Sequence, residues 1–240
     1  MASYTFREFS LEVALANTRR LGLSRIALKS FHLPLNTPVE DIRDAAARIR
    51  GEGFDLYGGG VIYMKNRDEV ERAFAYAEAA GMSVIIGVPD ESLLPLVEEK
   101  VTATGIRLAI HNHGPTDEAY PSPESALRKI RGRDPGIGIC LDAGHTMRCG
   151  IDPSDSARAC GGRLLDVHIK DVTSPDESGT TVEIGRGVID VPRFLRTLME
   201  IGYRHTVSLE FEKDGSDPLP GAAESMGYVR GALGGLRALR

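Results

Sequence analysis

The sequence is poor in cysteine and has no long apolar run. Its three cysteines, Cys140, Cys149 and Cys160, form no Cys-x-x-Cys pair, so neither a disulfide framework nor a zinc knuckle is expected and they are interpreted as packing residues. No stretch approaches the ~20 apolar residues of a membrane helix. Residues 1–10 carry no basic-then-apolar signal and open directly on apparent strand residues, which suggests a trimmed amino terminus. These absences favour a reducing cytoplasm and no membrane association.

An excess of positive charge is also missing. Lys and Arg number 29 against 34 Asp and Glu, for a net charge of -5, and no basic block offsets it. A phosphate backbone would be repelled. Nucleic acid is therefore not an expected partner.

What is present is an ordinary globular composition, with 42% hydrophobic and 26% charged residues, which is enough to fill a core. Short apolar or β-branched runs alternate with helical patterns, as in parallel strands joined by crossover helices. Eight strands are predicted: 3–6, 25–29, part of 54–64, 83–87, 107–111, 137–142, 164–170 and 206–210. The pattern predicts an α/β fold, a single (β/α)8 TIM barrel domain over residues 1–240.

The intervening helices have recognisable ends. One is predicted over 68–80, with Gly81 as its left-handed cap. Another begins after Asp190, where Val191 and Pro192 form the first turn, and runs to Ile201. The last runs from about Ala222 and ends in Gly234 and Gly235.

Active sites of such barrels lie where the strands end at their carboxyl side. Four consecutive predicted strands end in His111, Asp142, His168 and Glu210. A lone strand-end His or Asp is usually a loop anchor, but two imidazoles and two carboxylates on one axis supply the ligands of a divalent ion. Mn²⁺ is the expected metal, with Co²⁺, Fe²⁺, Zn²⁺ and Mg²⁺ as alternatives.

These residues belong to an ordered set of motifs spanning nearly the whole chain. The set comprises Ser3-Tyr-Thr-Phe-Arg-Glu-Phe, Leu28-Lys-Ser-Phe-His-Leu-Pro, Ile110-His-Asn-His-Gly, Leu141-Asp-Ala-Gly-His-Thr, Val167-His-Ile-Lys-Asp, Ile184-Gly-Arg-Gly-Val-Ile-Asp and Leu209-Glu-Phe-Glu. It resembles the sugar phosphate isomerase/epimerase family with a xylose isomerase-like barrel. The resemblance implies a metal at His111, Asp142, His168 and Glu210, with substrate contacts from His145, Arg148 and Lys170.

The chain departs from this family at one position. Members that epimerise free ketoses usually present Glu where this chain has His111, so only Glu210 remains of their proton-transfer pair. The departure brings in the dehydratase-like and keto-glycoside-processing branches as alternatives.

Further roles are expected from position. Glu210 is the candidate base, and Lys170, on the same strand face as His168, is expected to donate to a developing oxyanion, with a surface lysine as the alternative. His113 would either deliver the second proton or orient His111. Glu212 would form a salt bridge inside the pocket or face solvent.

A second group is expected at the pocket wall. Lys29 and His32 would line the pocket or anchor a loop. Arg186, within a Gly-Arg-Gly turn, is a further candidate for substrate contact.

The leading functional hypothesis is a metal-dependent isomerase or epimerase of a keto sugar, working through a metal-stabilised enediolate. A lyase or dehydratase sharing the first step is the alternative. A third reading is a sugar-binding subunit, and the lack of large insertions suggests that a partner or a second copy covers the barrel mouth. Related DNA-repair barrels are disfavoured because no basic groove is expected.

Overall fold

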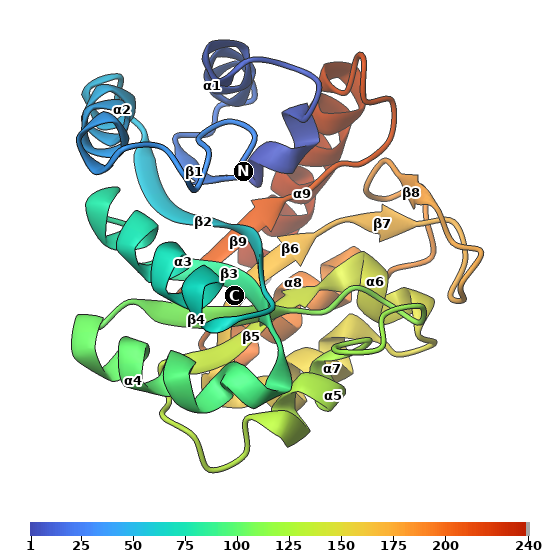
Figure 1. Cartoon of the computed structure of the whole chain (residues 1–240). Helices are drawn as coiled ribbons and strands as arrows, with labels where there is room; N and C mark the ends of the chain where they lie inside the picture. Colours follow the sequence, from blue (N-terminus) through green and yellow to red (C-terminus); the bar gives the residue numbers. More distant parts are fainter. Residues whose placement is uncertain (239–240) are drawn as a thin grey trace.

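The centre of the molecule is a parallel sheet of seven strands rolled into a nearly closed barrel (Figure 1). The computed structural model describes residues 1–238. The strands, in order around the sheet, are β1 (Arg25–Leu28), β2 (Asp55–Met64), β3 (Val84–Pro89), β4 (Arg107–His111), β5 (Ile137–Asp142), β6 (Leu164–Ile169) and β9 (Thr206–Leu209). Neighbours pair in parallel throughout. The predicted barrel and seven of its predicted strands are confirmed.

The predicted first strand is wrong. Residues Ser3–Phe6 form a 3-10 helix, η1, although their composition suits a strand. The two residues before it bridge the space between β1 and β9: Ala27 N donates to the Met1 carbonyl at 3.0 Å, and Ala2 N donates to the Leu209 carbonyl at 3.0 Å. A two-residue bridge therefore stands where the eighth strand was expected.

Helices surround the strands on the outside of the barrel (Figure 1). They are α1 (Leu11–Arg20), α2 (Val39–Gly51), α3 (Arg67–Ala79), α4 (Leu94–Thr104), α5 (Pro123–Lys129), α6 (Ala143–Arg148), α7 (Pro153–Cys160), α8 (Val191–Glu200) and α9 (Leu219–Ala238). Two short 3-10 turns, η2 (Glu91–Leu93) and η3 (Gly161–Arg163), precede α4 and β6.

Two of the predicted helices are confirmed to within a residue or two. Gly81 follows α3 with a φ of 61°, the left-handed geometry expected of a terminating glycine. The Asp190 side chain accepts from Arg193 N at 2.9 Å and caps α8.

The prediction for the last helix is wrong at both ends. Helix α9 begins at Leu219 and continues through Gly234 and Gly235. Val229 and Leu236 are buried on either side of the glycine pair, so packing against the barrel holds the helix together where glycine alone would weaken it.

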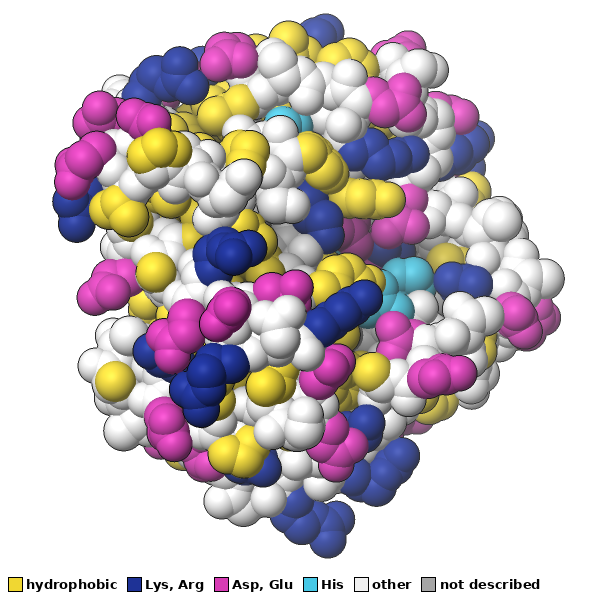
Figure 2. Space-filling model, in the orientation of Figure 1, with side chains coloured by type: hydrophobic (Ala, Val, Ile, Leu, Met, Phe, Trp, Pro, Cys, Tyr) yellow, Lys and Arg dark blue, Asp and Glu magenta, His cyan; other side chains and the backbone are white. Residues whose placement is uncertain are grey.

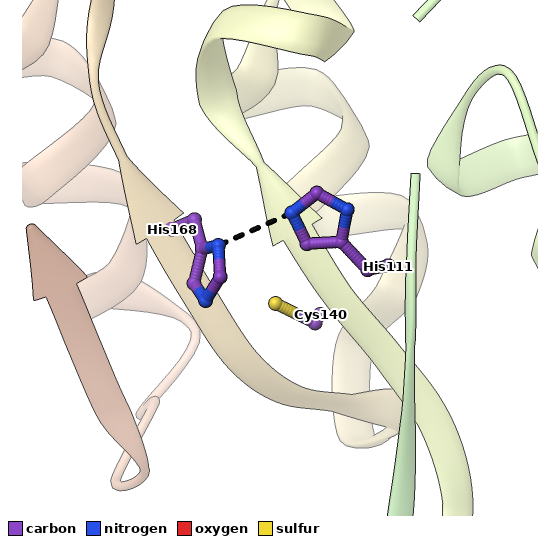
Figure 3. A group of neighbouring side chains, drawn as sticks. All are labelled: His111, Cys140 and His168. Atoms are coloured by element: carbon purple, nitrogen blue, oxygen red, sulfur yellow. Dashed lines mark hydrogen bonds between the residues drawn. The ribbon is translucent and has the colours of Figure 1, made fainter. Parts of the chain in front are cut away.

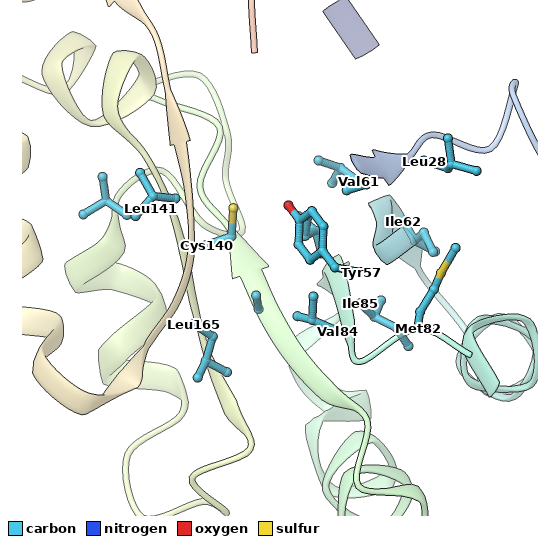
Figure 4. Close-up of a cluster of buried hydrophobic side chains, with 14 of the residues drawn as sticks. Leu28, Tyr57, Val61, Ile62, Met82, Val84, Ile85, Cys140, Leu141 and Leu165 are labelled. Atoms are coloured by element: carbon cyan, nitrogen blue, oxygen red, sulfur yellow. The ribbon is translucent and has the colours of Figure 1, made fainter. Parts of the chain in front are cut away.

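Buried side chains fill the barrel interior and the layer between strands and helices (Figure 4). A polar group lies within this core, where the Tyr57 hydroxyl donates to Asp166 Oδ2 at 2.9 Å and lies 2.8 Å from Ser208 Oγ. Within residues 1–238, no helix combines the length and apolar character needed to cross a membrane.

A short antiparallel hairpin, which was not predicted, follows β6. Its strands are β7 (Asp171–Val172) and β8 (Thr181–Val182). The buried Asp171 carboxylate accepts from the backbone N of Gly185, Gly187 and Ile189 at 2.9–3.1 Å. The turn at residues 183–189 is thereby fixed beside the hairpin, next to the carboxyl ends of the strands.

Candidate metal centre and substrate cavity

The four residues predicted as ligands come together at the carboxyl ends of their strands. His111, Asp142 and His168 end or nearly end β4, β5 and β6, and Glu210 follows β9 directly. One donor atom from each lies within 4.8 Å of those of the other three. All four side chains are buried. Parallel strands place their ends at one rim, which is why residues 99 positions apart in the chain meet here.

The contacts within this cluster are short. His111 Nε2 lies 3.1 Å from His168 Nδ1 and 3.4 Å from Asp142 Oδ2. His168 Nδ1 lies 3.2 Å from Glu210 Oε2. The four donors therefore converge on a common centre, as the ligands of a single ion would.

Lys170 completes the charged group. Its Nζ lies 2.9 Å from Asp142 Oδ2, 2.7 Å from Glu210 Oε2 and 2.8 Å from Glu212 Oε1. The side chain is 2% exposed, so the surface-lysine interpretation is wrong. The salt bridge considered for Glu212 is confirmed.

Burial and charge shift the pKa values of this group in definite directions. Burial lowers the pKa of His111 well below its usual value, so this imidazole is neutral. Burial would also lower the pKa of His168, but Glu210, Asp166 and Asp142 together outweigh it and raise that pKa. Burial opposes the charge of Lys170, yet its three carboxylate neighbours hold its pKa well above the ordinary value.

The donor set fits a divalent cation. A metal ion binds neutral imidazole, and in that state the carboxylates of Asp142, Glu210 and Glu212 exceed the single ammonium of Lys170 by two negative charges. A divalent ion neutralises that excess. Imidazole and carboxylate are also the ligands that first-row divalent metals accept.

A cavity of about 380 Å³ lies directly above the cluster. It is lined by Tyr4, Lys29, Val61, Tyr63, His111, His113, His145, Glu210 and Glu212. In the space-filling view, histidine side chains appear in a hollow bordered by acidic and basic groups (Figure 2). A small polar molecule can therefore reach the cluster through the barrel mouth.

His113 forms part of the cavity wall. Its Nε2 lies 3.1 Å from the Tyr63 hydroxyl, and its ring stacks on Tyr63 with centroids 5.6 Å apart. Burial lowers its pKa. Its ring centroid is 4.4 Å from that of His111. The ring makes its hydrogen bond through Nε2, with Tyr63. Among residues 1–238, Nδ1 has no hydrogen-bond partner.

A second cavity of about 440 Å³ adjoins the first and shares His145 and Glu212 with it. Arg148 lines this second cavity, and its guanidinium contacts His145 Nδ1 at 3.3 Å and donates to the Glu177 carbonyl at 3.0 Å. His145 and Arg148, both predicted to contact the substrate, therefore line the second cavity together with Val172 and Thr181 of the β7–β8 hairpin.

Lys29 also reaches the first cavity, where its Nζ donates to the Val61 carbonyl at 2.5 Å. Burial lowers its pKa.

Two other candidate residues lie outside both cavities, and for His32 the loop-anchoring alternative applies. His32 has both ring nitrogens engaged, by Ser3 Oγ at 2.9 Å and the Phe9 carbonyl at 3.1 Å, so it anchors a loop. Arg186 forms a two-point ion pair with Glu224 at 2.5 and 2.8 Å in an exposed position. Neither side chain lines the two cavities.

Sequence reasoning missed Tyr4 and Tyr63 in the cavity wall. Tyr4 belongs to η1, which the sequence places in a strand, and Tyr63 lies near the end of β2. The position of Tyr63 at a strand end was an available signal.

The fold and the cluster define a (β/α) barrel with a candidate metal centre, and comparison with known proteins gives the family. The sequence model described as xylose isomerase-like TIM barrel matches residues 6–232. The chain belongs to this family.

Two curated relatives match parts of the chain. The rhizopine catabolism protein MocC of Rhizobium meliloti is 28% identical over 145 residues, which is 54% of this chain and 44% of MocC. A 3-dehydroshikimate dehydratase of Pseudomonas putida is 26% identical over 191 residues, which is 70% of this chain and 29% of that enzyme. The chain spans less than half the length of either relative.

Solved structures share the fold over almost the whole chain. A D-tagatose 3-epimerase-like protein superposes with a TM-score of 0.78 at 18% identity, covering 99% of this chain and 97% of its own. The IOLI protein, solved with a bound zinc atom, gives 0.77 at 18% identity, covering 97% and 95%. The probable 3-DHS dehydratase AsbF of Bacillus anthracis gives 0.76 at 13% identity, covering 96% and 97%. Family neighbours thus include epimerase-like and dehydratase proteins.

Proposed function

We propose that this protein is a divalent-metal-dependent isomerase or epimerase of a keto sugar or sugar derivative. The observation that carries the proposal is the convergence of four buried donors within 4.8 Å below an open polar cavity. His111, Asp142, His168 and Glu210 would hold the ion. When bound, the ion would supply Lewis-acid stabilisation of negative charge that develops on substrate oxygens.

Glu210 is proposed to take the proton from the carbon next to the carbonyl. It is buried at the strand end and lines the cavity. His168 and Lys170 hold its pKa well below the usual value, although burial alone would raise it. The carboxylate is therefore present in the basic form at neutral pH.

Lys170 is proposed to stabilise the oxyanion that forms. An ammonium group has three donors; two of those of Lys170 donate to Glu210 and Glu212, and Nζ also lies 2.9 Å from Asp142 Oδ2. Glu212 is the partner with the most exposed side chain, at 30%. We therefore expect the Glu212 contact to be the one that gives way when a substrate oxygen enters.

His113 is proposed to return a proton on the other side of the substrate. If Nε2 accepts from the Tyr63 hydroxyl, the neutral ring carries its proton on Nδ1, the atom with no partner among the described residues. Nδ1 is buried and faces Asp117 Oδ2 at 3.8 Å, so the proton returned to the substrate would be the one on Nε2 of the charged ring, beside the cavity-lining Tyr63 hydroxyl.

Hydrogen exchange in D₂O tests the proposal. Metal-loaded protein incubated with 2-keto and 3-keto sugars should introduce deuterium next to the carbonyl, and Glu210→Gln should slow this by about 10² to 10⁴. Tyr57→Phe, which alters a polar group outside the cavity, is the matched control. Absence of exchange with every sugar of both types would contradict the proposal.

A lyase or dehydratase is the second candidate. It is favoured by His111, which stands where ketose epimerases usually present Glu, and by the likeness to 3-dehydroshikimate dehydratase. Both reactions begin with the same proton abstraction. After that step only the lyase would expel water or an alcohol from the carbon next to the carbanion, so mass analysis of the products separates the two.

A further inference from the structure

Cys140 lies one layer below the four-residue cluster. It is on β5, two positions before Asp142, so both side chains point to the same face of the strand and into the barrel. The thiol is completely buried. Figure 3 shows its sulfur turned toward the two imidazole rings of His111 and His168.

Distances place this sulfur within reach of a shared ion. The Cys140 Sγ and one ring nitrogen each of His111 and His168 lie within 4.8 Å of one another. In residues 1–238, neither Cys149 nor Cys160 belongs to any such group. The packing interpretation therefore remains for those two cysteines only.

A second observation points to a ligand at this level. His168 Nε2 and His111 Nδ1 have no hydrogen-bond partner among the described residues, and both side chains are 1% exposed. An unpaired nitrogen in a buried imidazole normally costs stability. An unpartnered His168 Nε2 in the same buried group as the Cys140 thiol is an arrangement that a metal ion would satisfy.

The two possible ligand sets differ in chemical preference. Thiolate and imidazole favour thiophilic ions such as Zn²⁺ and Co²⁺, whereas carboxylates favour harder ions such as Mn²⁺ and Mg²⁺. Both sets depend on His111 and His168. One ion at a time can therefore use the two imidazoles.

We propose that Cys140, His111 and His168 form an alternative site for thiophilic divalent ions, which competes with the set containing Asp142 and Glu210. The inference rests on the proposed metal centre. When the sulfur bonds to the ion, the thiol proton passes to solvent, and no group is oxidised or reduced.

The position of the alternative site determines how far an ion bound there lies from the substrate cavity. Cys140 and His168 do not line the cavity above the cluster, whereas His111 and Glu210 do. An ion held by the sulfur is therefore further from a bound substrate. Zinc is expected to inhibit the protein that manganese activates, and to do so less in a Cys140→Ala variant.

Cobalt absorption tests the sulfur bond directly. Metal-free protein titrated with Co²⁺ should develop the near-ultraviolet charge-transfer band of a sulfur-cobalt bond. Cys140→Ala and Cys140→Ser should lose the band, and Cys160→Ala, a buried thiol in α7, should keep it. Circular dichroism of each variant establishes that it is folded, and the serine variant preserves the size of the side chain.

Each result has a definite meaning. Cobalt bound without the band, or a band that survives in Cys140→Ala, overturns this inference and leaves the metal centre intact. No cobalt binding at all in equilibrium dialysis overturns both.

Competition between metals shows whether Cys140 binds the ion itself or only orients a residue that does. Cys140→Ala should weaken Zn²⁺ binding by at least about tenfold relative to Mn²⁺ binding, since even loss of an orienting group typically costs ten- to a hundredfold. An equal loss for both ions would indicate an orienting role and overturn the inference.

Discussion

Lys170 is the residue on which the electrostatics of the site depend. It is a buried ammonium within 2.9 Å of oxygens from three carboxylates. A charge buried in this way is tolerated only because its partners are charged, and the partners tolerate burial for the same reason. Removal of the lysine would leave the three carboxylates facing one another.

We therefore expect Lys170→Met to lower the free energy of unfolding by about 3–5 kcal/mol in the presence of a chelator. Divalent ion should restore part of the loss because it replaces the missing positive charge. Urea unfolding with and without Mn²⁺ measures both effects. Lys213→Met, which removes a partly exposed ion pair with Glu183, is the control and should cost much less, because solvent screens that pair. Equal losses in the two variants would refute the argument.

For single residues, the sequence predicts the positions of those that end strands but not of those that lie in loops. His111, Asp142 and His168 could be placed because strand ends converge by geometry. His32 and Arg186 could not, because their partners, the Phe9 carbonyl and Glu224, are 23 and 38 positions away along the chain. Nothing in local sequence specifies such partners.

Among the elements, η1 shows why one predicted strand is a helical turn. Tyr4, Thr5 and Phe6 suit a strand by composition, yet the segment bonds to the barrel through side chains. Ser3 Oγ accepts from Lys29 N at 2.8 Å, and Thr5 Oγ1 accepts from Phe211 N at 3.0 Å. The two hydroxyl oxygens accept from backbone N–H groups just after β1 and β9. In a continuous sheet, the carbonyls of a neighbouring strand would be the acceptors for such groups. Tertiary contacts therefore override strand propensity here.

Thr5 should consequently matter for stability through its hydroxyl. Thr5→Val keeps the shape of the side chain but leaves the buried Phe211 N–H without an acceptor, which costs about 1–3 kcal/mol. For a chain of this size the melting temperature should fall by roughly 2–4 °C for each kcal/mol. Thr5→Ser, which retains the oxygen, is the control in a thermal melt. A valine variant as stable as the serine variant would show that the bond contributes nothing.

For the whole molecule, the sequence predicts the barrel because its strand rhythm is regular, but it does not reveal how the barrel closes. Closure between β9 and β1 uses the backbone of Met1 and Ala2, and two residues carry no periodic pattern. The candidate metal centre takes ligands from an edge strand and from middle strands of the sheet, since Glu210 follows β9 and His111 ends β4. Ligands from distant strands make metal binding a property of the assembled barrel.

Binding of the ion should therefore stabilise the entire fold. An unfolded chain would not hold the four donors together, so an ion present at about 100 times its dissociation constant should add about 2.7 kcal/mol to the free energy of unfolding. The melting temperature should rise by roughly 5–10 °C and fall back on addition of a chelator. His168→Ala, with one donor removed, should bind less metal by elemental analysis and show little of this rise. His205→Ala, at an exposed histidine near the amino end of β9 that contacts Arg107, should behave like the parent protein. Equal stabilisation of the His168 and His205 variants would mean that the ion binds elsewhere, because only the first of them alters the cluster.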